Sequence, residues 1–170
     1  AIIRRSSKAP PDRAGNHHLP GVPGMIRFSK MADYGVLLLG HFARHPAELT
    51  SASGLAEAYH MPRSVVSNLL KEFAKAGLLK SRRGVAGGYL LARPADDVTL
   101  LEILNIVDGP VKLIDCAVDD LGTIGEACEY EDVCPSRSPM VAVNKRIVSF
   151  LESLTLSDLM KDSVPLPTPG

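Results

Sequence analysis

The stretch that most restricts how this chain can fold is a glycine-rich turn between two short extended runs. LLKSRR (78–83) leads into GVAGG (84–88), and YLL (89–91) follows. Extended runs joined by glycines are typical of a β-hairpin, because glycine adopts the backbone angles that tight turns require. These residues therefore predict a small two-stranded hairpin.

Three helical segments are predicted before this hairpin. Apolar residues at three- and four-residue steps indicate helices over about 29–45, 53–59 and 62–76, with Ser29 as a cap and Gly77 as a terminator with positive φ. The residues predicted to face inward are Met31, Tyr34, Leu38, Phe42, Leu55, Ala56, Tyr59, Val66, Leu69, Leu70 and Phe73. Helix, short helix, tight turn, helix and hairpin is the order of a winged helix-turn-helix.

The rest of the chain is predicted to add two helices and an irregular segment. Thr99 caps a helix over about 99–107, and residues 110–138 show little periodicity. An a/d repeat over 139–154 predicts a helix that packs against a second copy of the chain, through Met140, Val143, Ile147, Phe150 and Leu154. The predicted fold class is mainly α.

These patterns divide the chain into five regions. Residues 1–24 read as a disordered leader, with Met25 as the expected natural start, and 25–94 as the winged helix-turn-helix. Residues 95–138 hold a linking helix and a cysteine loop, 139–160 the dimerisation helix and end segment, and 161–170 a disordered tail. No apolar run reaches the ~18 residues of a membrane span and no secretory segment follows Arg4-Arg5, so we expect a cytoplasmic protein.

The formal net charge of zero hides a strong asymmetry along the 170 residues. Residues 25–94 carry ten basic and four acidic side chains, a net charge of +6, whereas 95–160 carry four basic and thirteen acidic ones, a net charge of −9. Such a split is expected when one half of a chain faces a polyanion. Two differently charged solvated surfaces are the alternative.

The third predicted helix leaves a polar face opposite its core stripe. Small hydroxyls, an amide and cations on such a face can bond to base edges and phosphates in a major groove, and basic residues of the hairpin can contact phosphates or a minor groove. The residues predicted to bind DNA are Arg63, Ser64, Ser67, Asn68, Lys71, Arg82, Arg83 and Gly87, beside Lys75 and Lys80. A merely solvated helix face and basic hairpin are the alternative.

All three cysteines lie in the acidic, weakly periodic segment, at Cys116, Cys128 and Cys134. An odd number of thiols without a secretory signal argues against a disulfide framework. Zinc usually takes closely spaced cysteine pairs, whereas an iron–sulfur cluster accepts wider spacing. Ordinary cysteines are the alternative. His41 and His45 have a metal-binding spacing, although such a pair is more often a polar helix edge.

AGLLKSRRGVAGGYLLAR (76–93) resembles the wing of the IscR/NsrR/SufR-type winged-helix repressors, in which a glycine-rich turn precedes Tyr-x-Leu. MIRFSKMADYGVLLL (25–39) and TLSDLM (155–160) resemble the first and last segments of that family. TLSDLM, together with the family resemblance, points most towards its SUF-system branch. The resemblance implies operator contacts by Ser64, Ser67, Asn68 and Arg83 and a homodimer built on Met140 to Leu154. Some iron–sulfur assembly regulators have glutamate where this chain has Ser67.

The resemblance also implies an iron–sulfur cluster on the three cysteines, with 4Fe–4S favoured and 2Fe–2S as the alternative. The first cysteine interval is eleven residues, against the family's usual five, and Arg137 occupies the place of a histidine ligand. The nitric-oxide-responsive branch takes an aspartate from the first helix of the other subunit, which corresponds to Asp33. Asp33 is therefore the predicted fourth ligand.

The expected function is that of a repressor that senses iron–sulfur, redox or nitric oxide status and controls SUF assembly genes. A nitric-oxide- or iron-responsive repressor and a cluster-free thiol-redox regulator are the alternatives. Neither an enzyme nor an electron carrier is expected, and no small-molecule substrate. The sequence shows no phosphate-binding loop, no nucleophile paired with a base and no histidine after His60.

Overall fold

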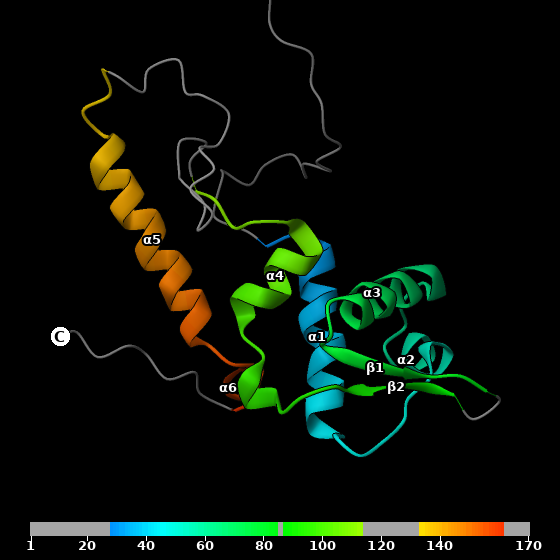
Figure 1. Cartoon of the computed structure of the whole chain (residues 1–170). Coiled ribbons are helices and arrows are strands. Elements are labelled where there is room, and N and C mark those ends of the chain that lie inside the picture. The colour runs from blue at the N-terminus through cyan, green and yellow to red at the C-terminus, as the bar shows by residue number, and fades with distance from the viewer. Residues whose placement is uncertain (1–27, 85–86, 114–132, 162–170) are drawn as a thin grey trace, which may run out of the picture.

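The structure is a computed structural model that describes residues 28–84, 87–113 and 133–161 (Figure 1). The predicted leader, the tail beyond Lys161 and two of the cysteines, Cys116 and Cys128, lie outside these residues. In chain order the elements are α1 (Lys30–Arg44), α2 (Ala52–Ala58), α3 (Arg63–Lys75), β1 (Leu79–Arg82), β2 (Gly88–Leu91), a 3-10 turn (Ala95–Asp97), α4 (Leu100–Asp108), α5 (Arg137–Ser153) and α6 (Leu156–Leu159). The mainly helical fold with one hairpin confirms the predicted class.

Helix α1 begins as predicted, but its buried face differs from the predicted stripe. The Ser29 hydroxyl accepts a hydrogen bond from the Ala32 N–H at 3.0 Å, which satisfies one of the free donors at the helix start. Met31, expected inside, is 36% exposed, whereas Ala32 and Gly35 are buried. A Cβ on Gly35 would stand 3.0 Å from the Phe73 ring, so small residues let α1 approach its neighbours closely.

The turn between α2 and α3 and the packing of α3 match the predictions closely. His60 has a φ of 52°, a left-handed conformation that reverses the chain within the short connection before Pro62. The buried residues of α3 are the predicted Val66, Leu69, Leu70 and Phe73. Gly77 follows the helix with a φ of 79°, as predicted for its terminator.

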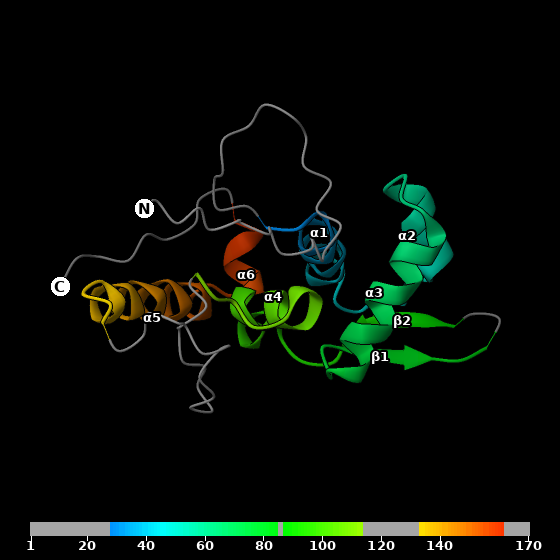
Figure 2. The same cartoon turned by 90° about the horizontal axis from the view of Figure 1, so that it is seen from above.

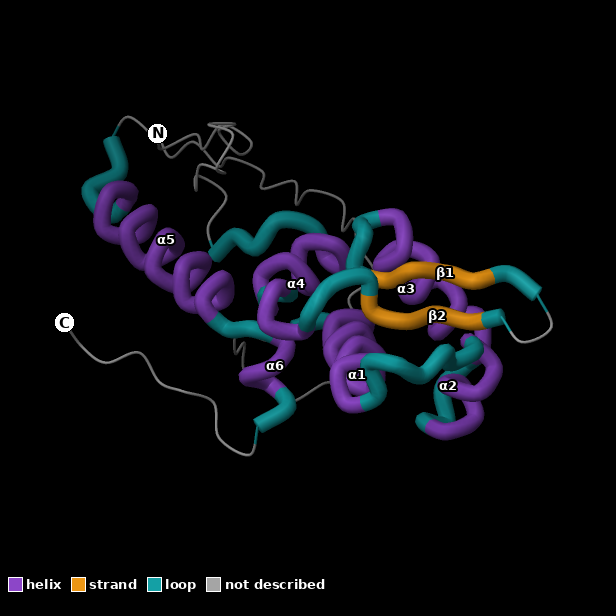
Figure 3. The backbone as a smooth tube through the Cα atoms, turned by 60° about the horizontal axis from the view of Figure 1, so that its bottom comes forward, coloured by secondary structure: helices purple, strands orange, loops and turns teal. Residues whose placement is uncertain are grey.

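The hairpin is tied to the helical body by a pairing that the sequence did not predict. Strands β1 and β2 run antiparallel, with Leu79 opposite Leu91 and Arg82 opposite Gly88. Thr50 pairs with Tyr89 through two backbone hydrogen bonds of 2.9 and 3.0 Å. The chain before α2 therefore fixes the outer edge of β2. Figure 3 shows the two strands at the same end of the molecule as α2 and α3.

Helix α5 extends away from the rest of the fold, and among the described residues its C-terminal half packs against the core (Figures 1 and 2). Leu151 and Leu154 are buried with Ala32, Leu100 and Leu104 in a second small core. Towards the other end of α5, Met140 is 36% and Val143 42% exposed. Two of the five residues of the predicted a/d stripe are therefore exposed in a single chain.

Asn144 on α5 is the buried polar residue among the described residues, at 6% exposure, and its Oδ1 accepts the Leu113 N–H at 2.9 Å. We expect Asn144→Ala to lower the free energy of unfolding by about 1–3 kcal/mol, because the N–H loses its acceptor in a partly buried place. Asn105→Ala removes a similar bond to the Val111 N–H in an exposed place and should cost less than about 1 kcal/mol. Urea unfolding compares the two variants, and equal losses would contradict the role given to Asn144.

Candidate functional site

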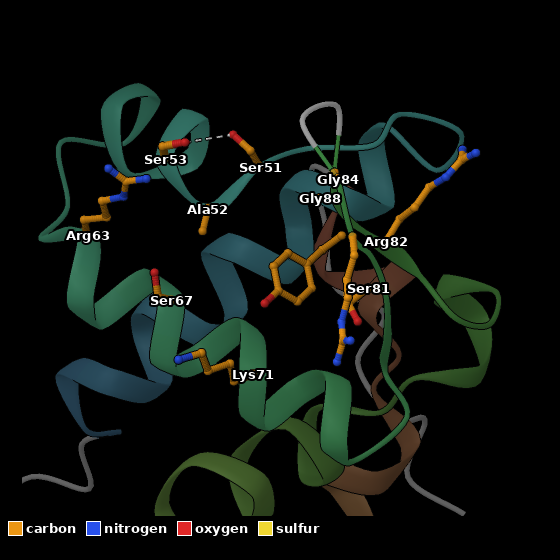
Figure 4. A pocket seen from close by; sticks show the side chains of 13 residues that line it. Ser51, Ala52, Ser53, Arg63, Ser67, Lys71, Ser81, Arg82, Gly84 and Gly88 are labelled. Atoms are coloured by element: carbon orange, nitrogen blue, oxygen red, sulfur yellow. Dashed lines mark hydrogen bonds between the residues drawn. The ribbon is translucent and has the colours of Figure 1, made fainter.

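A groove opens between α3, the start of α2 and the hairpin (Figure 4). Arg63, Ser67 and Lys71 follow one another along the side of α3 that faces the hairpin. Residues of β1, of β2 and of the glycine-rich turn between them line the opposite side. The full lining comprises Ser51, Ala52, Ser53, Arg63, Ser67, Lys71, Ser81, Arg82, Arg83, Gly84, Gly87, Gly88 and Tyr89.

The structure brings six of the eight predicted DNA-binding residues together in this groove: Arg63, Ser67, Lys71, Arg82, Arg83 and Gly87. Ser64 and Asn68 are exposed on α3 but do not line it. Lys75 lies outside the lining as well, and its ammonium pairs with Glu72 at 2.7 Å. The groove therefore lies between the predicted polar face of α3 and the predicted wing.

Several lining residues were not predicted from the sequence. The hydroxyls of Ser51 and Ser53 lie 3.1 Å apart, and Ser51 also caps α2 by accepting the Gly54 N–H. A serine that caps a helix start is a recognisable signal. Ser81 and Tyr89 carry no such signal, because their place in the groove depends on how the hairpin docks.

The groove is cationic, and its lining contains no carboxylate. Within the described residues, none of the guanidinium groups of Arg63, Arg82 and Arg83 or the Lys71 ammonium makes an ion pair. Side chains alternate along a strand, so Ser81 lies on the side of β1 on which Leu79 is buried, and Arg83 follows directly after the strand. Unpaired cations and hydroxyls in an open groove are suited to phosphate oxygens.

The start of α3 adds backbone donors beside these side chains. Pro62 provides no side-chain cap, and the first N–H groups that bond back to Pro62 are those of Val65 and Val66. Within the described residues, the N–H groups of Arg63 and Ser64 have no acceptor. Free N–H groups at the positive end of a helix favour an anion.

A histidine-centred cluster joins α1 to the end of α2 and to the chain before α2. His41 Nδ1 is 3.1 Å from the Tyr59 hydroxyl, and its Nε2 is 3.3 Å from the Thr50 hydroxyl. Burial, followed by the nearby His45, lowers the pKa of His41 below 6.5, although Glu48 acts in the opposite direction. Both ring nitrogens are engaged with hydroxyls, which is the arrangement of a polar helix edge and leaves neither free for a metal.

The predicted metal ligands fall into two groups. Cys134 is partly buried in the turn before α5, where its carbonyl accepts the Arg137 N–H at 3.4 Å. Asp33 is exposed in the first turn of α1. In the described ranges no three histidine, cysteine or acidic side chains gather at one place. A thiol and an exposed carboxylate have the chemistry to ligate iron, and the other two predicted ligands lie outside the described residues.

Residues 28–162 match the Rrf2 family model, described as an iron-dependent transcriptional regulator. CymR (YrzC), the global cysteine regulator of B. subtilis, is 25% identical with a TM-score of 0.62, over 80% of this chain and 97% of that one. IscR of T. potens is 28% identical with a TM-score of 0.60, over 81% and 88%. CymR of Staphylococcus aureus, at 22% identity and a TM-score of 0.59, shares the fold over 81% of this chain and all of its own.

These neighbours are winged-helix regulators, which agrees with the architecture described above. None of the helices in the described ranges is long and apolar enough to cross a lipid bilayer. The homologues regulate transcription and are not enzymes.

Proposed function

Because the chain belongs to the Rrf2 family of iron-dependent transcriptional regulators, we propose that it is a cytoplasmic, homodimeric repressor that binds operator DNA and responds to iron–sulfur, redox or nitric oxide status. Rrf2 regulators bind DNA and commonly act as dimers. The observation that carries the DNA-binding part is the acid-free cationic groove between α3 and the hairpin. Its cations and hydroxyls are the donors that proteins use to contact the phosphate backbone of DNA.

In the proposed complex, α3 enters the major groove and the hairpin reaches the flanking backbone or minor groove. The strand of phosphates between the two then runs along the groove, against Lys71, Ser67 and Arg83. Ser64 and Asn68 are exposed on α3 beside this line, so they are the side chains placed to bond to base edges. The groove residues supply affinity, and these two supply sequence preference.

The dimer is proposed to form along α5. Met140 and Val143 lie half a heptad apart on this helix and are exposed in the single chain. Apolar side chains in such an a/d pattern become buried when the helix packs against its copy. A dimer would also present two copies of α3 to a palindromic operator.

The sensing part is proposed to involve Cys116, Cys128, Cys134 and, from the other subunit, Asp33. Such a ligand set would hold a 4Fe–4S or 2Fe–2S cluster, which supplies one-electron redox chemistry and reactivity towards nitric oxide. Cys134 lies just before α5 and Asp33 lies on α1, so the two sides of the site belong to the dimer helix and to the DNA-binding unit. A change in ligation would bias their relative orientation.

SUF assembly genes are the proposed targets, because TLSDLM (155–160) and the family resemblance point most towards that branch. A thiol-based regulator without a cluster is the second candidate. The structural likeness to CymR, a global cysteine regulator, favours it, as does the partly buried, unpaired Cys134. Both candidates use the same groove and the same dimer.

The deciding experiment is anaerobic purification of the full chain, followed by a visible absorption spectrum and counts of iron and sulfide. Affinity for a duplex selected from a random DNA library is then measured before and after cluster removal. A coloured protein whose affinity changes on cluster loss supports the sensor. A colourless protein whose affinity changes on thiol oxidation supports the second candidate, and failure to select any duplex overturns the DNA-binding proposal.

Asp33→Ala tests the fourth ligand. We expect the purified variant to retain clearly less iron and sulfide than the parent chain while it remains a dimer, because a cluster on three thiolates alone keeps an open and labile iron. Asp108→Ala is the matched control, since Asp108 is an exposed carboxylate whose bond to the Ser29 hydroxyl involves no thiol. Equal iron retention by Asp33→Ala and the parent would show that another group completes the site.

A further inference from the structure

We propose that His41 is a positioning residue for DNA binding. Its imidazole bonds to Thr50, which pairs with the hairpin, and to Tyr59, which ends α2 before the turn into α3, so it ties both sides of the groove to α1. The inference rests on the proposed function, since it concerns how the same groove keeps its shape. It assigns a task to a side chain that does not itself line the groove.

The two hydrogen bonds of His41 lead to opposite walls of the groove. Tyr59 is the residue at which α2 ends, immediately before the turn into α3. Thr50 lies at the outer edge of the hairpin, where it exchanges two backbone hydrogen bonds with Tyr89. Tyr89 in turn lines the groove. One ring on α1 thus connects the turn before α3 to the strand opposite it.

The surroundings of the ring favour a single, fixed arrangement. The Phe42 and Tyr59 rings meet the imidazole edge-on, with centroids 5.6 and 5.8 Å away. His45 stands 4.8 Å away and is paired with Glu48, and burial disfavours a charge on His41. A neutral imidazole donates from one nitrogen and accepts at the other, and both hydroxyls can serve either role. The bonds therefore need no charge.

Without these bonds the hairpin would keep its strand pairing and the core packing of Leu79 and Leu91, but its edge at Thr50 would lose the side-chain tie to α1. A guanidinium contributes fully to phosphate binding only when it is held near the productive geometry. We therefore expect His41→Leu to weaken duplex binding about fivefold, and His41→Gln to restore much of the loss because an amide can also donate and accept. Thr50→Val removes only the Thr50 hydroxyl and should weaken binding in the same direction.

A double-mutant cycle separates positioning from general destabilisation. If His41 positions the hairpin, Arg83→Ala should cost less affinity in the His41→Leu background than in the parent chain. The two fold-losses should differ by a factor of at least about three. Hydrogen exchange of the Tyr89 amide, measured without DNA, should become faster in His41→Leu and in Thr50→Val. His45→Leu, which alters an exposed neighbour of His41, should change neither quantity.

An Arg83→Ala effect of equal size in both backgrounds, or unchanged exchange at Tyr89, would overturn the proposal. If His41→Leu does not fold, the same two quantities are read from Thr50→Val. Should the parent chain bind no selected duplex, the proposed function fails, whereas the exchange of the Tyr89 amide still decides whether His41 holds the hairpin.

Discussion

A chain carrying Lys71→Glu should bind its operator at least about 30-fold more weakly than the parent chain. Lys71 lines the groove and makes no ion pair within the described residues. The substitution removes one cation and places a carboxylate beside the phosphates, and such like-charge contact costs about 2 kcal/mol or more, which is roughly a 30-fold loss. Fluorescence anisotropy on a labelled duplex measures the change.

The salt dependence of binding gives an independent reading of the same contact. Each phosphate neutralised by a protein cation steepens the dependence of log affinity on log salt by about 0.9. Lys71→Gln should therefore reduce that slope by about one. Because the slope counts displaced ions rather than stability, a folding defect alone would leave it unchanged.

Lys75→Glu is the matched control, since it makes the same charge change one turn further along α3. Lys75 is exposed, lies outside the groove lining and already pairs with Glu72. We expect its affinity to stay within about threefold of the parent. Equal losses in the two variants would mean that total charge, and not the groove, governs binding.

The sequence alone predicts those features of the fold that depend on a single helix or turn. The stripe Val66, Leu69, Leu70 and Phe73 of α3 is buried as predicted, because a helix with one apolar face has one way to bury it. The caps Ser29 and Thr99 and the positive φ of Gly77 were likewise predictable, since each depends on residues within one turn. Local chemistry fixes local structure.

Features that depend on two distant segments could not be predicted. Met31 was expected inside because it continues the three- and four-residue steps of the apolar stripe on α1, but at this end of the helix the small residues Ala32 and Gly35 face the core instead, and a Cβ on Gly35 would already stand 3.0 Å from the Phe73 ring. The pairing of Thr50 with Tyr89 joins residues 39 positions apart, and it places Tyr89 in the groove. Neither segment alone carries a signal for that contact.

Gly88→Ala should cost about 1–3 kcal/mol in the free energy of unfolding and weaken operator binding about tenfold. A Cβ at Gly88 would stand 2.7 Å from the Thr50 carbonyl oxygen and 2.8 Å from its carbonyl carbon. These are backbone atoms held by the pairing of Thr50 with Tyr89, so β2 must move away from them. Arg82 pairs with Gly88 across the hairpin, so Arg82 and the adjacent Arg83 move with β2. Thermal unfolding and anisotropy measure the two effects.

Gly77→Ala separates the loss of stability from the loss of hairpin geometry. Gly77 has a φ of 79°, and a Cβ there would have no atom of the described residues within 4 Å, so alanine meets backbone strain of about 1 kcal/mol and no clash. It lies at the far end of α3 from the groove, and its affinity for DNA should remain that of the parent. If Gly88→Ala also binds like the parent, the hairpin does not contribute to the interface. If both variants lose affinity equally, stability alone controls binding, and the role assigned to the Thr50–Tyr89 pairing is wrong.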